Sequence, residues 1–218
     1  GTDNAVICPP TFAMYRQSAL LQGVAVREAP LTAEFGLDLA AIDAVADDNT
    51  KLIFVCSPNN PTANIMDGDA IARLCARFDG KALIIVDETY IEYAATESLI
   101  AAVESCANLV VLRTLSKSHA AAGIRCGAAV AQSDVIALLR KVLAPYPIPQ
   151  PVVQAILPIL TATNQSRLQG LRTDIIERRD AFMAGLADCD AVVQIYPSDA
   201  NFILMQVQDA ADLISRCR

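Results

Sequence analysis

Three apolar segments, each followed at once by polar residues, constrain the fold of this chain most strongly. They cover residues 52–56, 82–86 and 109–112 and contain no charged side chain. A strand that is apolar on both faces is typical of a parallel sheet with helices on either side, because neither face then meets water. Between the first two lies an amphipathic helical pattern, residues 67–78. This alternation of strand and helix predicts an α/β fold.

Shorter segments extend the alternation along the chain. We expect further strands at residues 5–8, 24–28 and 127–131, and further helices at residues 14–22, 37–45 and 133–142. Ser133 has the side chain of a good N-cap for the last of these helices. Together the segments predict three layers, α/β/α, around an open and mostly parallel sheet.

The pattern changes near residue 145. Four prolines between residues 145 and 151 interrupt the regular structure. After them we expect a long helix over residues 166–188, two strand-like segments at 191–196 and 201–207, and a helix that starts at Ala210. The sequence therefore predicts a partial large domain over residues 1–165, followed by a connecting helix and the start of a smaller α+β domain over residues 166–218.

Charge and cysteine content exclude several classes of function. The 17 basic and 24 acidic residues give a net charge of −7, so no basic excess points to nucleic acid or anionic lipid as a partner. No apolar run approaches the roughly 18 residues that a membrane span needs. The seven cysteines form no C-x-x-C pair and there is one histidine, which argues against a metal site. We interpret the cysteines as thiols of a reduced, cytoplasmic protein.

The polar residues that follow the apolar strands are the candidates for function, because ligands of open α/β sheets bind at the carboxyl ends of strands. Asp87 follows one strand and needs a partner for its charge. Lys117 follows another, and a lysine in a cleft can attack carbonyl groups. Arg125 lies close to hydroxyl side chains and could clamp a phosphate. The residues alone leave two interpretations open: a ligand site, or an ion pair of Asp87 with Lys117 or Arg125.

Four motifs occur in a recognisable order: S-P-N-N-P-T at residues 57–62, V-D-E-T-Y at 86–90, T-L-S-K at 114–117 and G-I-R-C-G at 123–127. In order and spacing the chain resembles the fold-type I aminotransferases, which use pyridoxal 5′-phosphate. Residues 8–15, 144–147 and 196–204 make it most similar to the histidinol-phosphate aminotransferases within that family. The resemblance covers nearly the whole chain, and it implies the large cofactor-binding domain of that fold.

The resemblance assigns roles around the ring of the cofactor. Lys117 would be the catalytic residue, which binds the cofactor covalently and then moves protons. Asp87 would face the pyridine nitrogen and keep it protonated. Phe12 would stack on the ring, with Tyr15 as a competing aromatic side chain.

The resemblance also implies which residues would bind the polar groups of the cofactor, its 3′-oxygen and its phosphate. Asn60 and Tyr90 would hydrogen-bond its 3′-oxygen. Thr114, Ser116 and Arg125 would bind its phosphate. No metal ligand is implied.

The activity implied by the resemblance is amino transfer from histidinol phosphate to 2-oxoglutarate in L-histidine biosynthesis. The partners would be an amino acid phosphate, a 2-oxo acid and a second copy of the chain in a homodimer. Threonine-phosphate decarboxylase and aromatic aminotransferase remain alternatives that share the cofactor residues. A non-catalytic, cofactor-binding regulatory domain is a further alternative from another class.

The chain departs from the family pattern in two ways. Ala63 stands where the family loop has glycine; if this position needs a positive φ, alanine costs about 1 kcal/mol. The resemblance also implies that the chain is truncated at both ends, so that a tyrosine given to the partner subunit and an arginine for the substrate carboxylate lie outside it. We therefore expect residues 1–218 alone to transaminate at least about a hundredfold more slowly than a whole family member.

Overall fold

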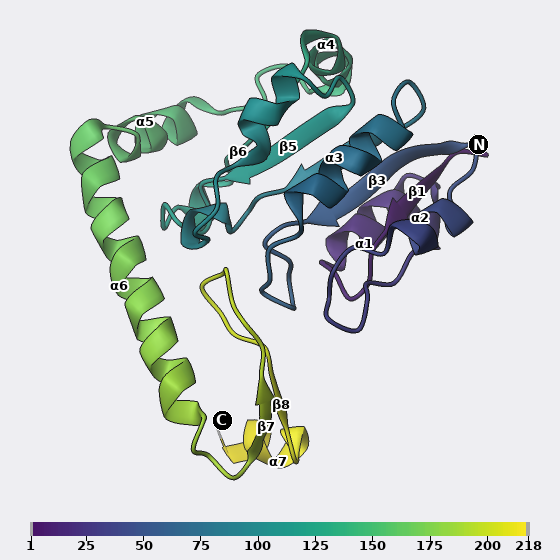
Figure 1. Ribbon diagram of the computed structural model, residues 1–218. Helices are drawn as coiled ribbons and strands as arrows, with labels where there is room; N and C mark the ends of the chain where they lie inside the picture. The colour runs from purple at the N-terminus through teal and green to yellow at the C-terminus, as the bar shows by residue number, and fades with distance from the viewer. Residues whose placement is uncertain (1, 217–218) are drawn as a thin grey trace.

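A six-stranded sheet forms the centre of the larger part of the molecule (Figure 1). The computed structural model describes residues 2–216. In chain order the strands are β1 (Asn4–Ile7), β2 (Ala25–Glu28), β3 (Thr50–Cys56), β4 (Leu83–Asp87), β5 (Leu109–Thr114) and β6 (Gly127–Ala131). They are arranged β2-β1-β3-β4-β5-β6, and every neighbouring pair is parallel except β5 and β6. The predicted mostly parallel sheet is confirmed.

Helices cover both faces of the sheet, because the strands carry apolar side chains on both sides. One face packs against α2 (Leu39–Val45), α3 (Gly68–Arg77) and the 3-10 helix η2 (Leu99–Glu104). The main core lies there and includes Ile42, Ile53 and Ile84, all fully buried. The other face packs against α1 (Met14–Leu21), whose Tyr15 contacts a second cluster of buried residues. The predicted three layers are confirmed.

Two expectations about the helices after β6 need correction. α4 (Ser133–Val142) begins where expected, but Gln132 holds the N-cap position and no side chain caps the helix. The proline-rich stretch leads into a helix that was not expected, α5 (Gln150–Ile159). Proline is tolerated in a first turn because its missing N–H would have no partner there. Pro149 and Pro151 therefore introduce α5.

The long helix α6 (Ala162–Leu186) leads away from the sheet to a small C-terminal unit (Figure 1). That unit consists of the antiparallel strands β7 (Val192–Ile195) and β8 (Met205–Val207), followed by α7 (Ala210–Arg216). The loop between β7 and β8 returns to the sheet, where the backbone N–H of Asp199 donates to Ala63 O over 2.7 Å. The domain division at residue 165 stays a prediction.

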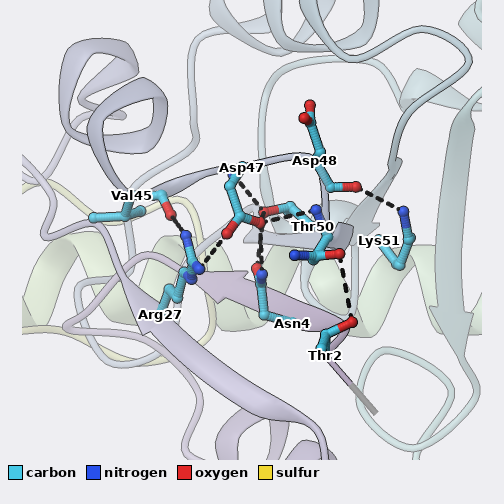
Figure 2. A network of polar contacts seen from close by, with 9 residues as sticks. Thr2, Asn4, Arg27, Val45, Asp47, Asp48, Thr50 and Lys51 are labelled. Atoms are coloured by element: carbon cyan, nitrogen blue, oxygen red, sulfur yellow. Dashed lines mark hydrogen bonds and ion pairs between the residues drawn. The ribbon is translucent and has the colours of Figure 1, made fainter.

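A polar network holds the amino ends of β1 and β3 together (Figure 2). Asn4 Nδ2 donates to Asp47 Oδ1 over 2.9 Å, and Thr50 Oγ1 donates to Asn4 Oδ1 over 2.8 Å. Arg27 adds an ion pair with Asp47. Asn4 and Thr50 are each 1% exposed, so these bonds satisfy polar groups that water cannot reach. The network lies at the edge of the sheet opposite to the candidate site and gives that edge a structural role.

Within residues 2–216, no helix is both long enough and apolar enough to cross a membrane.

Candidate active site

A cavity of about 300 Å³ opens at the edge of the sheet where β3, β4 and β5 end. It is lined by Phe12, Cys56, Asn60, Asp87, Thr89, Tyr90, Thr114, Ser116, Lys117, Ala122 and Arg125. All eight residues singled out from the sequence are among them. The parallel direction of the strands explains this, because polar residues at their carboxyl ends must meet at one edge.

Asp87 lies on the side of the cavity formed by β4, and its carboxylate is held by three donors. Thr89 donates to Oδ1 from its backbone N over 3.0 Å and from its hydroxyl over 2.6 Å. Tyr15 donates its hydroxyl to Oδ2 over 2.7 Å. Among the described residues, no ion pair links Asp87 to Lys117 or Arg125. The interpretation of Asp87 as half of an ion pair at the sheet edge is therefore wrong.

Lys117 reaches the cavity from the loop that follows β5. Its Nζ lies 5.5 Å from the centre of the Tyr90 ring, within the range of a cation–π contact. Tyr90 is buried against Ala63 and Phe202. The amine therefore has a buried aromatic neighbour, and Lys117 as a whole is exposed.

Hydroxyl and guanidinium donors gather at one end of the cavity. Thr114 Oγ1 lies 2.9 Å from Ser116 Oγ and accepts from the Ser116 backbone N over 3.1 Å. Arg125 follows the 3-10 helix η3 (Ala122–Ile124) in a left-handed conformation with φ 57°. Its Nη1 donates to Ala122 O over 2.9 Å, which leaves further guanidinium donors free for an anion.

The loop after β3 is tied to the loop after β1 through Asn59, which is fully buried. Asn59 Nδ2 donates to Pro10 O over 2.8 Å, and Thr11 Oγ1 donates to Asn59 Oδ1 over 3.0 Å. These bonds fix the positions of the neighbouring residues Asn60 and Phe12 at the cavity. Sequence reasoning missed Asn59, although its place inside the S-P-N-N-P-T motif was a signal.

Phe12 and Tyr15 have different places. Phe12 lines the cavity and is 40% exposed, whereas Tyr15 is 7% exposed and does not line it. Tyr15 instead stacks on Phe54, with ring centres 4.9 Å apart and planes at 13°. Burial raises the pKa of the Tyr15 phenol and, to about 12, that of the Cys56 thiol beside it. Both groups are therefore neutral at physiological pH.

Two other titratable residues, in or close to the motifs, lie outside this cavity. His119 lines a separate, mainly apolar cavity of about 390 Å³, together with Ile156 and Leu160 of the α5 region. Glu88 is 1% exposed and accepts a hydrogen bond from the backbone N of Leu99 over 2.7 Å. Both are structural neighbours of the site.

Comparison with known proteins gives the family. The family model "Aminotransferase class I and II" matches residues 1–217. The chain belongs to the class I and II aminotransferases. Among curated aminotransferases, the histidinol-phosphate aminotransferase of Aeromonas hydrophila subsp. hydrophila is 41% identical over 212 residues, which are 97% of this chain and 59% of the relative. Histidinol-phosphate aminotransferase 2 of Idiomarina loihiensis is 41% identical over 219 residues, 98% of this chain and 60% of the relative.

Solved structures of other proteins share the fold. The histidinol-phosphate aminotransferase from Clostridium acetobutylicum superposes with a TM-score of 0.86 at 21% identity, over 99% of this chain and 67% of that one. L-threonine-O-3-phosphate decarboxylase from Porphyromonas gingivalis superposes with a TM-score of 0.79 at 20% identity. The match covers 95% of this chain and 61% of the decarboxylase. The chain thus spans about 60% of the length of the curated aminotransferases it matches.

The donor set of the cavity fits pyridoxal phosphate, the cofactor implied by aminotransferase membership. The cofactor needs an amine for its aldehyde, an acceptor for its ring N–H and donors for its phosphate. Lys117 is an amine, Asp87 is a carboxylate that accepts, and the donors of Arg125 and Ser116 lie at one end. No group of three or more metal-ligating side chains occurs within residues 2–216.

Proposed function

We propose that the chain carries the cofactor site of a pyridoxal-phosphate-dependent transaminase that converts histidinol phosphate and 2-oxoglutarate to imidazole acetol phosphate and glutamate, in L-histidine biosynthesis. The observation that carries the proposal is the single cavity in which an amine, a carboxylate and a phosphate-type donor set converge. The curated relatives at about 40% identity, which bear the histidinol-phosphate name, support the choice of substrate.

Each lining residue has a role that its chemistry allows. When bound, pyridoxal phosphate withdraws electrons from the α-carbon of the amino acid and carries the amino group between the two substrates. Lys117 Nζ is the base that removes the proton from the α-carbon. Asp87 keeps the proton on the ring nitrogen, because a carboxylate in a poorly solvated place favours a nearby positive charge.

The remaining residues bind and orient. Asn60 and Tyr90 would hydrogen-bond the 3′-oxygen. Phe12 would cover one face of the ring and exclude water from it. The phosphate would be bound by Thr114, Ser116 and Arg125, whose hydroxyl and guanidinium donors match phosphate oxygens.

Covalent labelling tests the cofactor site directly. The chain is mixed with pyridoxal phosphate, its visible absorbance is recorded, and borohydride is added before peptide mapping. The expected result is a cofactor-labelled peptide that contains Lys117 and disappears in Lys117→Arg. Lys81→Arg is the matched control, because Lys81 is exposed and lines a different cavity. Labelling that survives Lys117→Arg would refute the assignment.

The substrate is tested by changes in the spectrum of the loaded protein. Histidinol phosphate should convert the bound cofactor to its amine form, and 2-oxoglutarate should restore it. The threonine-phosphate decarboxylase structure, which shares the fold, makes O-phosphothreonine the first competing substrate, with carbon dioxide release as its signature. Aromatic amino acids, offered as amino donors, test the alternative that the protein is an aromatic aminotransferase. Cofactor binding without turnover of any amine would favour a regulatory role.

A homodimer and a cytoplasmic location remain part of the proposal. Small molecules are its only other proposed partners.

A further inference from the structure

The two oxygens of the Asp87 carboxylate are bound in different ways. Oδ1 accepts from Thr89, two residues along the chain, through both the backbone N and the hydroxyl. Oδ2 accepts from the Tyr15 hydroxyl over 2.7 Å, and Tyr15 is 72 residues away. The local contacts come with the turn after β4. The contact to Oδ2 exists only because α1 packs on the same face of the sheet as Asp87.

Tyr15 is held in place independently of Asp87. Its ring stacks on Phe54 of β3 and meets the edge of the Phe12 ring, with centres 5.6 Å apart and planes at 81°. Its side chain is buried behind the cavity wall and does not line the cavity. Burial raises the pKa of the phenol, so the hydroxyl keeps its proton and donates it in the bond. Tyr15 thus offers Asp87 a fixed donor.

We propose that Tyr15 is a positioning residue for the reaction: through its hydrogen bond to Oδ2, it sets the orientation in which Asp87 meets the ring nitrogen of the cofactor. The inference rests on the proposed function. A carboxylate at a strand end can rotate about its Cβ–Cγ bond, and donors on both oxygens restrict that rotation. The Tyr15 hydroxyl would then contribute to cofactor affinity without touching the cofactor.

The first test replaces only the hydroxyl. Tyr15→Phe keeps the ring and its contacts with Phe54. The bond exists before the cofactor binds, so its loss acts on affinity only through the contact that Asp87 makes with the ring nitrogen. A hydrogen bond to a charged group corresponds to about tenfold in an equilibrium constant, so pyridoxal phosphate should bind up to about tenfold more weakly. Tyr93→Phe is the control. Tyr93 is also buried, and this substitution removes a hydroxyl that makes no hydrogen bond to Asp87. An affinity of Tyr15→Phe within twofold of the unmodified chain would overturn the proposal.

The second test separates positioning from general support of the fold. An analogue of pyridoxal phosphate with carbon in place of the ring nitrogen cannot bind Asp87 through that atom. The unmodified chain and Tyr15→Phe should therefore bind the analogue within about twofold of each other. A penalty of equal size for cofactor and analogue would assign Tyr15 a purely structural role and overturn the proposal.

The third test combines substitutions of Tyr15 and Asp87 and measures the affinity for pyridoxal phosphate itself. In an Asp87→Asn background, adding Tyr15→Phe should change cofactor affinity by less than about twofold, because the interaction it acts through is already lost. Additive losses would contradict this coupling. Failure of the proposed function has a different signature: the unmodified chain would form no Lys117-linked product with pyridoxal phosphate at all, and the inference would fall with it.

Discussion

At the scale of single residues, Ala63 next to the site has a left-handed backbone, with φ 65°. This conformation costs a non-glycine residue about 1–2 kcal/mol. Ala63 is fully buried, and its carbonyl accepts the bond from Asp199 that attaches the C-terminal loop. The position therefore requires a positive φ, as the family glycine suggested. The contacts around it compensate for the alanine.

We predict that Ala63→Gly destabilises the fold less than a glycine placed at another buried alanine. Ala70, in α3, is the matched control, because it is also buried and has helical backbone angles. Both substitutions remove one methyl group and add the flexibility of glycine, but only Ala63→Gly relieves a positive φ. The free energies of unfolding should therefore differ by about 1–2 kcal/mol in favour of Ala63→Gly. Equal losses in denaturant titrations would show that Ala63 is unstrained.

The second residue-scale prediction concerns His119, the single histidine of the chain. Burial lowers its pKa; Glu92 opposes this shift, and Arg172 and Arg113 add to it. The folded chain thus binds a proton less readily than the unfolded chain. The contribution of neutral His119 to the stability of the fold should be fully present above the pKa of the unfolded chain, about 6.5. It should be lost as the pH falls through the lower pKa of the folded chain.

Nuclear magnetic resonance can follow this one imidazole directly. Its titration midpoint should lie below about 6.5, the value of an unperturbed histidine. The loss of stability between neutral and mildly acidic pH should be smaller in His119→Gln. A midpoint at or above the unperturbed value would contradict the prediction.

At the scale of elements, the ends of β4 and β5 are joined by charged side chains. Arg113 of β5 lies 3.6 Å from Glu88, just past β4, and 2.5 Å from Glu92. Burial raises the pKa of Glu88, while bonds from Ser98 and Leu99 and the charge of Arg113 oppose the increase. Because Asp87 precedes Glu88 and Thr114 follows Arg113, this ion pair lies next to two residues that are proposed to bind the cofactor.

We predict that Arg113→Met lowers the free energy of unfolding by about 3 kcal/mol, because Glu88 is left buried without its countercharge. Arg77→Met is the control: Arg77 pairs with Asp43, but these side chains are 64% and 42% exposed. An exposed pair contributes at most about 1 kcal/mol. Urea titration measures the free energy of unfolding of both variants. A similar loss in both would show that the contact between Arg113 and Glu88 is not stabilising.

At the scale of the whole molecule, an apolar surface extends from α4 into the loop after it. We call it the 138–148 surface; its large side chains, all at least 38% exposed, are Leu138, Leu139, Val142, Leu143, Tyr146 and Ile148. Contiguous exposed apolar side chains mark places where another surface packs. The 390 Å³ apolar cavity beside α5 belongs to the same half of the sheet.

We predict that residues 1–218 associate in a concentration-dependent way through the 138–148 surface. Sedimentation velocity should show the monomer fraction rise in the double variant Val142→Glu, Tyr146→Ser. Ile214→Glu is the control, because Ile214 is 54% exposed but lies on α7, far from α4 (Figure 1). An unchanged monomer fraction in the double variant would exclude this surface.

The sequence by itself determined the sheet and the members of the cavity. Strands such as residues 52–56 are apolar on both faces, which is typical of a parallel sheet covered by helices. Parallel strands bring their carboxyl ends to one edge, and the residues alone pointed to Asp87, Lys117 and Arg125 there. The resemblance to the aminotransferases was needed to add the other five residues that line the cavity, such as Phe12 and Asn60. Local rules were less reliable at the prolines, where α5 begins, because the same residue type ends one helix and starts another.

Only the tertiary structure decided which side chain each of these residues contacts. The Tyr15 bond to Asp87, the Asn59 bonds to the loop after β1 and the return of Asp199 to Ala63 each join residues far apart in the chain. Periodicity tells which face of an element is buried, but it does not tell which element covers that face. That choice depends on the register of the strands and on the packing of α1 and the C-terminal loop, which arise only when the whole chain has folded.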